Sequence, residues 1–220
     1  MTMDSDGFTT DLKHIAIEGV IGAGKTSLTL KLAKLLKGRA VLERFEENPF
    51  LEKFYDDIEH YAFQTQMFFL LSRYKQQQEL AQIDLFEQVI VSDYMFEKDK
   101  IFAYLNLQDD ELRLYEALVG LLEKNIPKPD LVVYLQCNID RLLGNIKKRG
   151  RKFERSMSKD YIQSLNEAYN YFFFRYKSSP LLIVNADQID FVNNEKDFDK
   201  LAAEILKPRK LAEYYNPILK

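Results

Sequence analysis

The sequence of this chain predicts an α/β fold in which a five-stranded parallel sheet is flanked by helices on both faces. Short apolar runs rich in β-branched residues alternate along the chain with longer stretches of helical character. The runs are almost continuously apolar, which is typical of strands buried on both faces of a parallel sheet. The expected strands are Ile15–Glu18, Ala40–Glu43, Val89–Ser92, Leu131–Leu135 and Leu181–Val184.

The expected helices have recognisable ends. The first follows a glycine-rich loop, carries leucines at helical spacing and ends at Gly38. A second opens at Asn48-Pro49, because proline is tolerated in the first turn of a helix. Later helices are expected at Tyr61–Ile83, at Glu111–Asn125, from Ser158 as cap to Tyr176, and from Asn194 as cap to a point before Pro208. The tail, residues 208–220, is expected to be irregular.

Composition limits the classes of function. The chain has 220 residues, which fits a single domain over residues 1–220, and its 46% hydrophobic and 30% charged residues are ordinary for a globular protein. The net charge of −3 and the lack of a large basic block argue against a nucleic-acid partner. The first ten residues do not resemble a signal peptide, and no apolar run approaches the length of a membrane span. Cys137 is the single cysteine, so no intramolecular disulfide can form, which suits a reducing compartment. From these three observations we expect a cytoplasmic protein without a membrane partner.

The strongest motif is a phosphate-binding loop between the first expected strand and the first expected helix. Residues 19–26 match G-x-x-x-x-G-K-[ST], a pattern whose glycines let backbone amides point at phosphate oxygens. The lysine supplies a charge for the outer phosphates, and the threonine hydroxyl is placed to bind Mg²⁺. The expected ATP-binding residues here are Gly19, Val20, Ile21, Gly22, Ala23, Gly24, Lys25, Thr26 and Ser27. The motif predicts a P-loop nucleoside triphosphatase fold.

The loop alone does not name a reaction. The guanine-reading motifs N-K-x-D and T-K-x-D of GTPases are missing from the sequence, and so is the L-S-G-G-Q signature of transporter ATPases. A kinase acting on a small acceptor would need four further parts: a base, a second acid near magnesium, a cationic lid and an acceptor pocket.

Two acidic residues stand at the ends of expected strands, where ligands of such folds bind. Glu43 ends the second strand and can accept the proton of an acceptor hydroxyl, although an acidic loop that starts a helix would also explain the carboxylates around it. Asp93 directly follows the third strand and can hold Mg²⁺ together with Thr26. It is equally well placed to cap a helix beginning near Met95, and both roles are compatible.

A cationic segment and an amphipathic helix supply candidates for the remaining two parts. Residues 145–157 concentrate lysines and arginines around Gly150, which favours a hinged lid over phosphates, although a solvated helix end carries the same residue types. On the helix expected at Tyr61–Ile83, Gln66 and Arg73 lie two turns apart on one face, among aromatic residues. This face is either a base-reading wall or simply part of the core.

Taken in order, these motifs resemble the deoxynucleoside kinase family, in particular its deoxyadenosine, deoxyguanosine and deoxycytidine kinases. The resemblance spans Ile15 to about Leu206. It rests on Glu47-Asn48-Pro49-Phe50 after Glu43, on the Q-x-x-x-x-x-S-R pattern from Gln66 to Arg73, and on R-G-R-x-x-E from Arg149 to Glu154. It implies Mg²⁺-dependent transfer of the ATP γ-phosphoryl group to the 5′-hydroxyl of a deoxynucleoside.

For the acceptor side, the resemblance implies that Glu43 is the general base and that Tyr55 holds the 3′-hydroxyl. Gln66 would bind the base, supported by Arg73, which would pair with Asp99 in the next loop.

For the ATP side, the resemblance implies that Arg149 and Arg151 clamp the phosphates and that Glu154 reaches the 3′-hydroxyl when the lid closes. The segment with Asn185 and Asp187 would touch the adenine of ATP.

Two positions depart from the family pattern. Tyr94 stands where an arginine normally contacts the catalytic glutamate, and Arg44 is a candidate to replace that cation. Asn145 stands where another lid arginine is expected, with Lys147 or Lys148 as candidates to replace it.

The resemblance therefore implies a homodimeric deoxynucleoside kinase of nucleotide salvage that prefers deoxyadenosine, then deoxyguanosine or deoxycytidine. The alternatives are a nucleoside monophosphate kinase such as thymidylate kinase, for which Arg44 would hold the acceptor phosphate, and a non-enzymatic nucleotide switch. Feedback inhibition by a deoxynucleoside triphosphate is also consistent with the resemblance.

Overall fold

The computed structural model describes residues 10–81 and 89–217. Six parallel strands form one sheet in the order β2-β3-β1-β4-β5-β6. The strands are β1 (His14–Gly19), β2 (Arg39–Val41), β3 (Ile90–Ser92), β4 (Leu131–Gln136), β5 (Leu181–Asn185) and β6 (Ala212–Tyr215). The predicted α/β class and parallel arrangement are confirmed, and the number of strands is six rather than five.

The sixth strand lies in the tail that was expected to be irregular. In β6, Ala212 to Tyr215 pair in parallel with Leu181 to Val184 of β5, at the edge of the sheet. Three of its four residues are exposed, so the strand lacks the apolar run by which buried strands are recognised. Backbone pairing to an exposed sheet edge, rather than burial of side chains, forms this strand.

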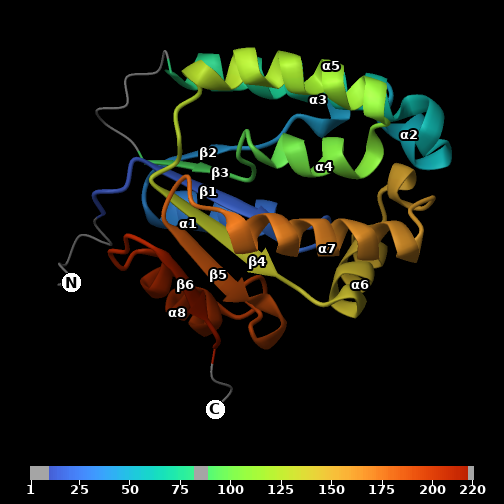
Figure 1. Ribbon diagram of the computed structural model, residues 1–220. Coiled ribbons are helices and arrows are strands. Elements are labelled where there is room, and N and C mark those ends of the chain that lie inside the picture. Colours follow the sequence, from blue (N-terminus) through green and yellow to red (C-terminus); the bar gives the residue numbers. More distant parts are fainter. Residues whose placement is uncertain (1–9, 82–88, 218–220) are drawn as a thin grey trace.

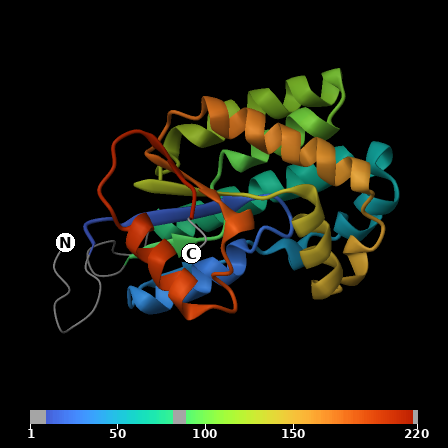
Figure 2. The ribbon, with the colours of Figure 1, turned by 90° about the horizontal axis from the view of Figure 1, so that it is seen from below.

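Helices cover both faces of the sheet. Figure 2 shows α1 and α8 on one face and α4 and α7 on the other, while Figure 1 shows α3 and α5 lying beyond α4. The helices are α1 (Lys25–Leu35), α2 (Leu51–Asp56), α3 (Ile58–Ala81), α4 (Lys98–Asn106), α5 (Asp109–Leu122), α6 (Ile139–Arg149), α7 (Lys159–Arg175) and α8 (Glu195–Ile205). Short 3₁₀ turns are η1 (Phe45–Glu47), η2 (Glu123–Asn125), η3 (Lys152–Glu154) and η4 (Ala186–Gln188).

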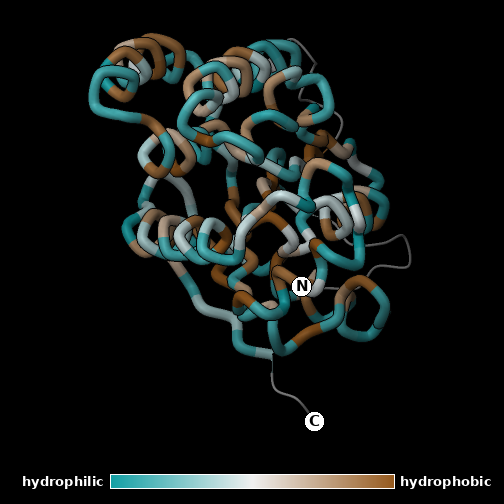
Figure 3. Tube along the Cα trace, turned by 90° about the vertical axis from the view of Figure 1, so that its right-hand side faces the viewer, coloured by the Kyte–Doolittle hydropathy of each residue, from teal (hydrophilic) through white to brown (hydrophobic). Residues whose placement is uncertain are grey.

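The main core is the sheet and the helix faces packed on it. The residues of β1, β4 and β5 are almost all buried, and the strand segments in the middle of the tube in Figure 3 are correspondingly hydrophobic. A second cluster, with Leu70, Phe96 and Tyr115 fully or almost fully buried, joins α3 to α4 and α5. The sheet and the α3 layer are thereby joined, and the space between them holds the candidate site.

Several local predictions are confirmed. Ser158 caps α7 by accepting a hydrogen bond from the Tyr161 amide, and Asn194 caps α8 by accepting from Lys196 and Asp197. The helix expected at Tyr61–Ile83 corresponds to α3, which begins at Ile58; its expected end lies outside the described residues.

Two boundaries differ in ways that matter for function. Strand β2 ends at Val41, so Glu43 stands in the loop beyond the strand rather than at its last position. The helix expected near Met95 begins only at Lys98, and its N-cap is Glu97, so Asp93 does not cap it. Both acidic residues are thereby left on loops beside the carboxyl ends of strands. Among the described helices, none is long and apolar enough to cross a membrane.

Candidate active site

The phosphate loop joins β1 to α1, and its backbone requires glycine. Gly24 has a φ of 94° and precedes α1, and Gly22 has a φ of 89°, a region that side chains with a Cβ rarely adopt. A Cβ on Gly22 would also lie 2.7 Å from the carbonyl oxygen of Leu142 in α6. Asn145 of α6, where a lid arginine was expected, donates from its amide nitrogen to the Gly22 carbonyl at 2.8 Å. Helix α6 and the loop therefore pack as one unit.

Lys25 lies at the start of α1 with its ammonium inside the loop. Nζ donates to the carbonyl oxygens of Gly19 at 2.7 Å and Val20 at 3.2 Å. Burial and the like charge of Lys98 lower the pKa of Lys25 to about 8, against the opposing effect of Glu18, Asp93 and Glu43. A second cation therefore lies close to the phosphate-loop lysine.

Thr26 and Asp93 lie together, as expected for a shared metal site. The Thr26 hydroxyl donates to Asp93 Oδ2 at 2.7 Å, and the Glu43 amide donates to Asp93 Oδ1 at 2.7 Å. Burial raises the pKa of Asp93, while the Thr26 hydrogen bond lowers it. The hydroxyl and carboxylate oxygens are hard ligands of the type that Mg²⁺ prefers, so these side chains fit the ion.

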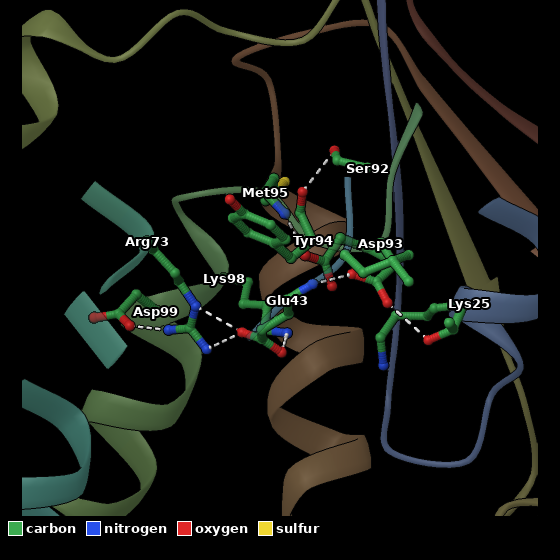
Figure 4. Close-up of polar contacts among 12 residues, drawn as sticks. Lys25, Glu43, Arg73, Ser92, Asp93, Tyr94, Met95, Lys98 and Asp99 are labelled. Carbon is green, nitrogen blue, oxygen red and sulfur yellow. Dashed lines mark hydrogen bonds and ion pairs between the residues drawn. The ribbon is translucent and has the colours of Figure 1, made fainter. Parts of the chain in front are cut away.

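The Glu43 carboxylate is held by two cations from different elements (Figure 4). Arg73 of α3 donates to Oε1 from Nε at 2.8 Å and from Nη2 at 2.6 Å. Lys98, in the first turn of α4, donates from Nζ to Oε2 at 2.7 Å. Arg73 and Lys98 are each only 3% exposed. Although burial alone raises the pKa of Glu43, the charges of Lys98 and Arg73 lower it to about 2.

One face of α3 forms a wall of the pocket that also contains Glu43. Ala62, Thr65, Gln66, Phe69 and Arg73 recur at helical spacing along one face and line a single pocket. Asp99 is fully buried at the start of α4, not in a loop, and it forms an ion pair with Arg73 as expected. The side-chain nitrogen of Gln66 donates to the Asp99 carbonyl at 2.9 Å and to its carboxylate at 2.7 Å.

The lid segment, residues 145–157, lies beside α2 (Figure 1), and its residues Arg149, Arg151, Phe153 and Glu154 line this pocket. Glu154 is 5% exposed and forms ion pairs with Arg149 and, at 3.6 Å, with Arg151. The Arg151 guanidinium lies 4.0 Å from the centre of the Phe45 ring, and Phe153 stacks on Tyr55. The three lid residues singled out from the sequence therefore lie together above the pocket that Tyr55 lines.

Two pockets meet at the phosphate loop. The acceptor pocket contains Glu43, Tyr55, Gln66, Arg73 and the lid residue Glu154, while the second follows the loop from Gly22 to Ser27. Four side chains line both pockets: Lys25, Thr26, Arg149 and Arg151. A triphosphate on the loop would therefore point its last phosphate at the acceptor pocket.

Asn185 and Asp187, which were expected to touch the adenine of ATP, lie outside both pockets. Neither lines the loop pocket, and the Asp187 carboxylate accepts a hydrogen bond from the Asn138 amide at 3.0 Å. The wall that the loop pocket shares with this region consists instead of Arg141 and residues 190–193. Arg141 donates to the carbonyls of Asp187 and Ile189 and so fixes that segment.

A cation other than the expected Arg44 contacts Glu43. Tyr94 is fully buried in a cluster with Val41, Leu80 and Ile90, and it does not line the acceptor pocket. Arg44 is exposed and pairs with Glu79 at 3.2 Å, away from Glu43. Lys98, which sequence reasoning missed, contacts Glu43 instead. The signal that would have found it is a lysine five residues after Asp93, beside the expected partner of Arg73.

The phosphate loop, the adjoining acceptor pocket and the carboxylate between them define a P-loop phosphotransferase. A family model described as deoxynucleoside kinase matches residues 15–208. The chain belongs to this family, and it is an ATP-dependent phosphotransferase. The family resemblance predicted from the motifs is confirmed.

Individual relatives agree with this assignment. A deoxyguanosine kinase of Bacillus subtilis is 37% identical, with 87% of this chain and 95% of the relative aligned. A deoxyadenosine kinase of Lactobacillus acidophilus is 34% identical over 88% of this chain and 95% of the relative. Among solved structures, a deoxyadenosine kinase from M. mycoides with bound dATP superposes with a TM-score of 0.77 at 26% identity. That match covers 87% of this chain and 98% of the other.

The conformation of the phosphate loop yields a test. Replacing Gly22 by alanine should weaken ATP binding at least about tenfold, because the left-handed backbone and the Leu142 carbonyl oppose a Cβ. Isothermal titration with ATP measures the effect. Gly144→Ala is the matched control, because a Cβ there meets nothing within 4 Å. Equal affinities of the two variants would contradict the requirement for glycine.

Proposed function

We propose that the chain phosphorylates the 5′-hydroxyl of a deoxynucleoside bound in the acceptor pocket, with Glu43 as general base. The observation that carries the proposal is that Glu43 lines the pocket beside Lys25 and Thr26 of the phosphate loop. The base would receive the hydroxyl proton while the hydroxyl oxygen attacks the last phosphate in line. Since Arg73 and Lys98 lower the pKa of Glu43, its carboxylate carries no proton before the transfer.

The other proposed roles follow from position. The loop amides and Lys25 hold the phosphates, and Arg149 and Arg151 neutralise charge on the transferring group, because they line both pockets. Thr26 and Asp93 would hold Mg²⁺, which supplies positive charge to the phosphate oxygens when bound. Tyr55 and Glu154 lie on the pocket wall where a sugar hydroxyl could bond to them.

The same geometry argues against a monophosphate acceptor. The two buried cations of the acceptor pocket, Arg73 and Lys98, are already bonded to carboxylates. Arg44, which would have held an acceptor phosphate, does not line the pocket. An acceptor phosphate would therefore have to compete with Glu43 and Asp99 for these cations.

For the base, we propose deoxyadenosine first, followed by deoxyguanosine or deoxycytidine. The amide nitrogen of Gln66 is committed to Asp99 by two hydrogen bonds, so its oxygen is the group left to bond a base. An amide oxygen accepts from an exocyclic amino group, which adenine, guanine and cytosine carry and thymine lacks. The printed names of the relatives include both deoxyguanosine and deoxyadenosine kinases, so they support the set of amino-bearing bases.

The direct test is phosphorylation of the four natural deoxynucleosides and of their monophosphates with ATP and Mg²⁺. We expect turnover of the amino-bearing deoxynucleosides, with deoxyadenosine highest, and a kcat/KM for thymidine at least about tenfold lower. Turnover of monophosphates alone would contradict the proposed acceptor. A preference for thymidine would contradict the role of Gln66 while leaving the reaction class intact.

The base role is tested by Glu43→Gln. Because the amide cannot take the proton, kcat should fall about 10²–10⁴-fold, while ATP affinity changes little. Glu52→Gln, an exposed carboxylate on α2 that does not line the pocket, is the matched control. Near-normal turnover of Glu43→Gln would remove Glu43 from the role.

We also propose a homodimer formed through α4 and α7. Between these helices lies a largely apolar groove whose walls include Ile101, Leu105 and Phe172. Tyr104 and Tyr171 line it and are 59% and 64% exposed, and such exposed aromatic surface is typical of protein contacts. Light scattering after size exclusion should give twice the 25.9 kDa chain mass, and Tyr171→Glu should give the monomer. A monomeric unaltered chain would contradict the proposal.

A further inference from the structure

A buried lysine in the first turn of α4 bonds to the proposed base, Glu43. Lys98 is 3% exposed, and it lines the acceptor pocket. Burying an ammonium group costs free energy unless the charge is compensated. Among the described residues its hydrogen-bonding partner is Glu43 Oε2, at 2.7 Å. An ammonium has three donors, so two remain for groups that enter the pocket.

The two oxygens of Glu43 are not equivalent. Within residues 10–81 and 89–217, Oε1 accepts two hydrogen bonds from Arg73, at 2.8 and 2.6 Å, whereas Oε2 accepts one, from Lys98. Each carboxylate oxygen has two lone-pair sites. Oε2 is therefore the oxygen with room to receive a proton. An acceptor hydroxyl bonded to Oε2 must lie beside the Lys98 ammonium, because both share that oxygen.

Lys98 also shares the acceptor pocket with Lys25 and Thr26 of the phosphate loop. Its charge contributes to the lowered pKa of Lys25, and it acts on the buried carboxylates of Glu18 and Asp93. Figure 4 shows Lys98 next to Glu43, with Asp93 on the other side of Glu43 from Arg73. Lys98 therefore lines the same pocket as the proposed base and as Lys25 and Thr26 of the phosphate loop.

We propose that Lys98 is a catalytic residue that contacts the acceptor oxygen and the transferring phosphoryl group; this inference rests on the proposed function. As the 5′-oxygen forms its bond to the γ-phosphorus, its proton passes to Glu43 Oε2. The bond from that phosphorus to the bridging oxygen breaks, and the electron pair leaves with ADP. The Lys98 ammonium offsets the negative charge shared by the acceptor oxygen and the oxygens of the group in transfer.

Neither Tyr94 nor Arg44 is placed to act on the acceptor oxygen. Tyr94 packs in a hydrophobic cluster, and Arg44 pairs with Glu79 on the surface. Lys98 supplies from the start of α4 the positive charge that the family pattern would place at position 94. The alternative is a purely structural role, in which Lys98, beside Arg73, only balances the charges of the partly buried Glu43 and the buried Asp99.

The test is Lys98→Met, assayed with the deoxynucleoside that the unaltered chain turns over best. We expect kcat to fall about 10²–10³-fold, as when one donor to transition-state charge is removed. The dissociation constants of ATP and deoxynucleoside should change less than about threefold, because the loss falls on the reacting state. Lys98→Arg, which keeps the charge, should retain at least about tenfold more activity than Lys98→Met. Lys75→Met is the control, because Lys75 is exposed on α3 and lines neither the acceptor pocket nor the groove between α4 and α7.

A double variant separates direct action from positioning and from loss of folding. Glu43→Gln/Lys98→Met removes both members of the pair, so no buried charge is stranded. It should be at least about tenfold slower than Glu43→Gln alone, because Lys98 acts on the acceptor oxygen itself. Equal rates of these two variants, or unchanged kcat in Lys98→Met, would overturn the inference while the unaltered enzyme remains active. An unaltered chain inactive on every deoxynucleoside would instead overturn the proposed function, and the inference with it.

Discussion

The Glu43 carboxylate, which is 16% exposed and is held between two buried cations, is the interaction on which the site depends. Arg73 comes from α3, Lys98 from α4 and Glu43 from the loop after β2, so the cluster joins three separate parts of the chain. An unpaired charge at this depth would be strongly destabilising. The pairing therefore lets an ionised carboxylate lie inside the molecule, and it fixes the carboxylate against the phosphate loop.

The parallel sheet brings Glu43, Asp93 and the phosphate loop together. Glu43, Asp93 and the phosphate loop all follow the carboxyl ends of the neighbouring strands β2, β3 and β1. In such sheets the ligand binds beyond those ends. The Asp93 carboxylate connects the three segments, since it accepts hydrogen bonds from the Thr26 hydroxyl and the Glu43 amide. The lid residues Arg149 and Arg151 line both the acceptor pocket and the pocket along the phosphate loop.

Features encoded by contiguous residues could be predicted from the sequence. The phosphate loop, the buried strands and the caps at Ser158 and Asn194 each depend on a few neighbouring positions. Lys98 could not be assigned, because its contact with Glu43 spans 55 residues and depends on how α4 packs. Strand β6 was missed because an exposed edge strand has no apolar run. For Arg44, its position next to Glu43 in the sequence was misleading, since its side chain turns toward Glu79 on α3.

The central claim is that the acceptor hydroxyl bonds to Glu43 Oε2 and lies beside Lys98, with the phosphate loop behind it. A crystal structure of the complex with deoxyadenosine and ADP measures this directly. We expect the 5′-oxygen within hydrogen-bonding distance, about 3 Å, of both Glu43 Oε2 and Lys98 Nζ. A 5′-oxygen held on the Arg73 side of Glu43, or out of reach of its carboxylate, would contradict the account.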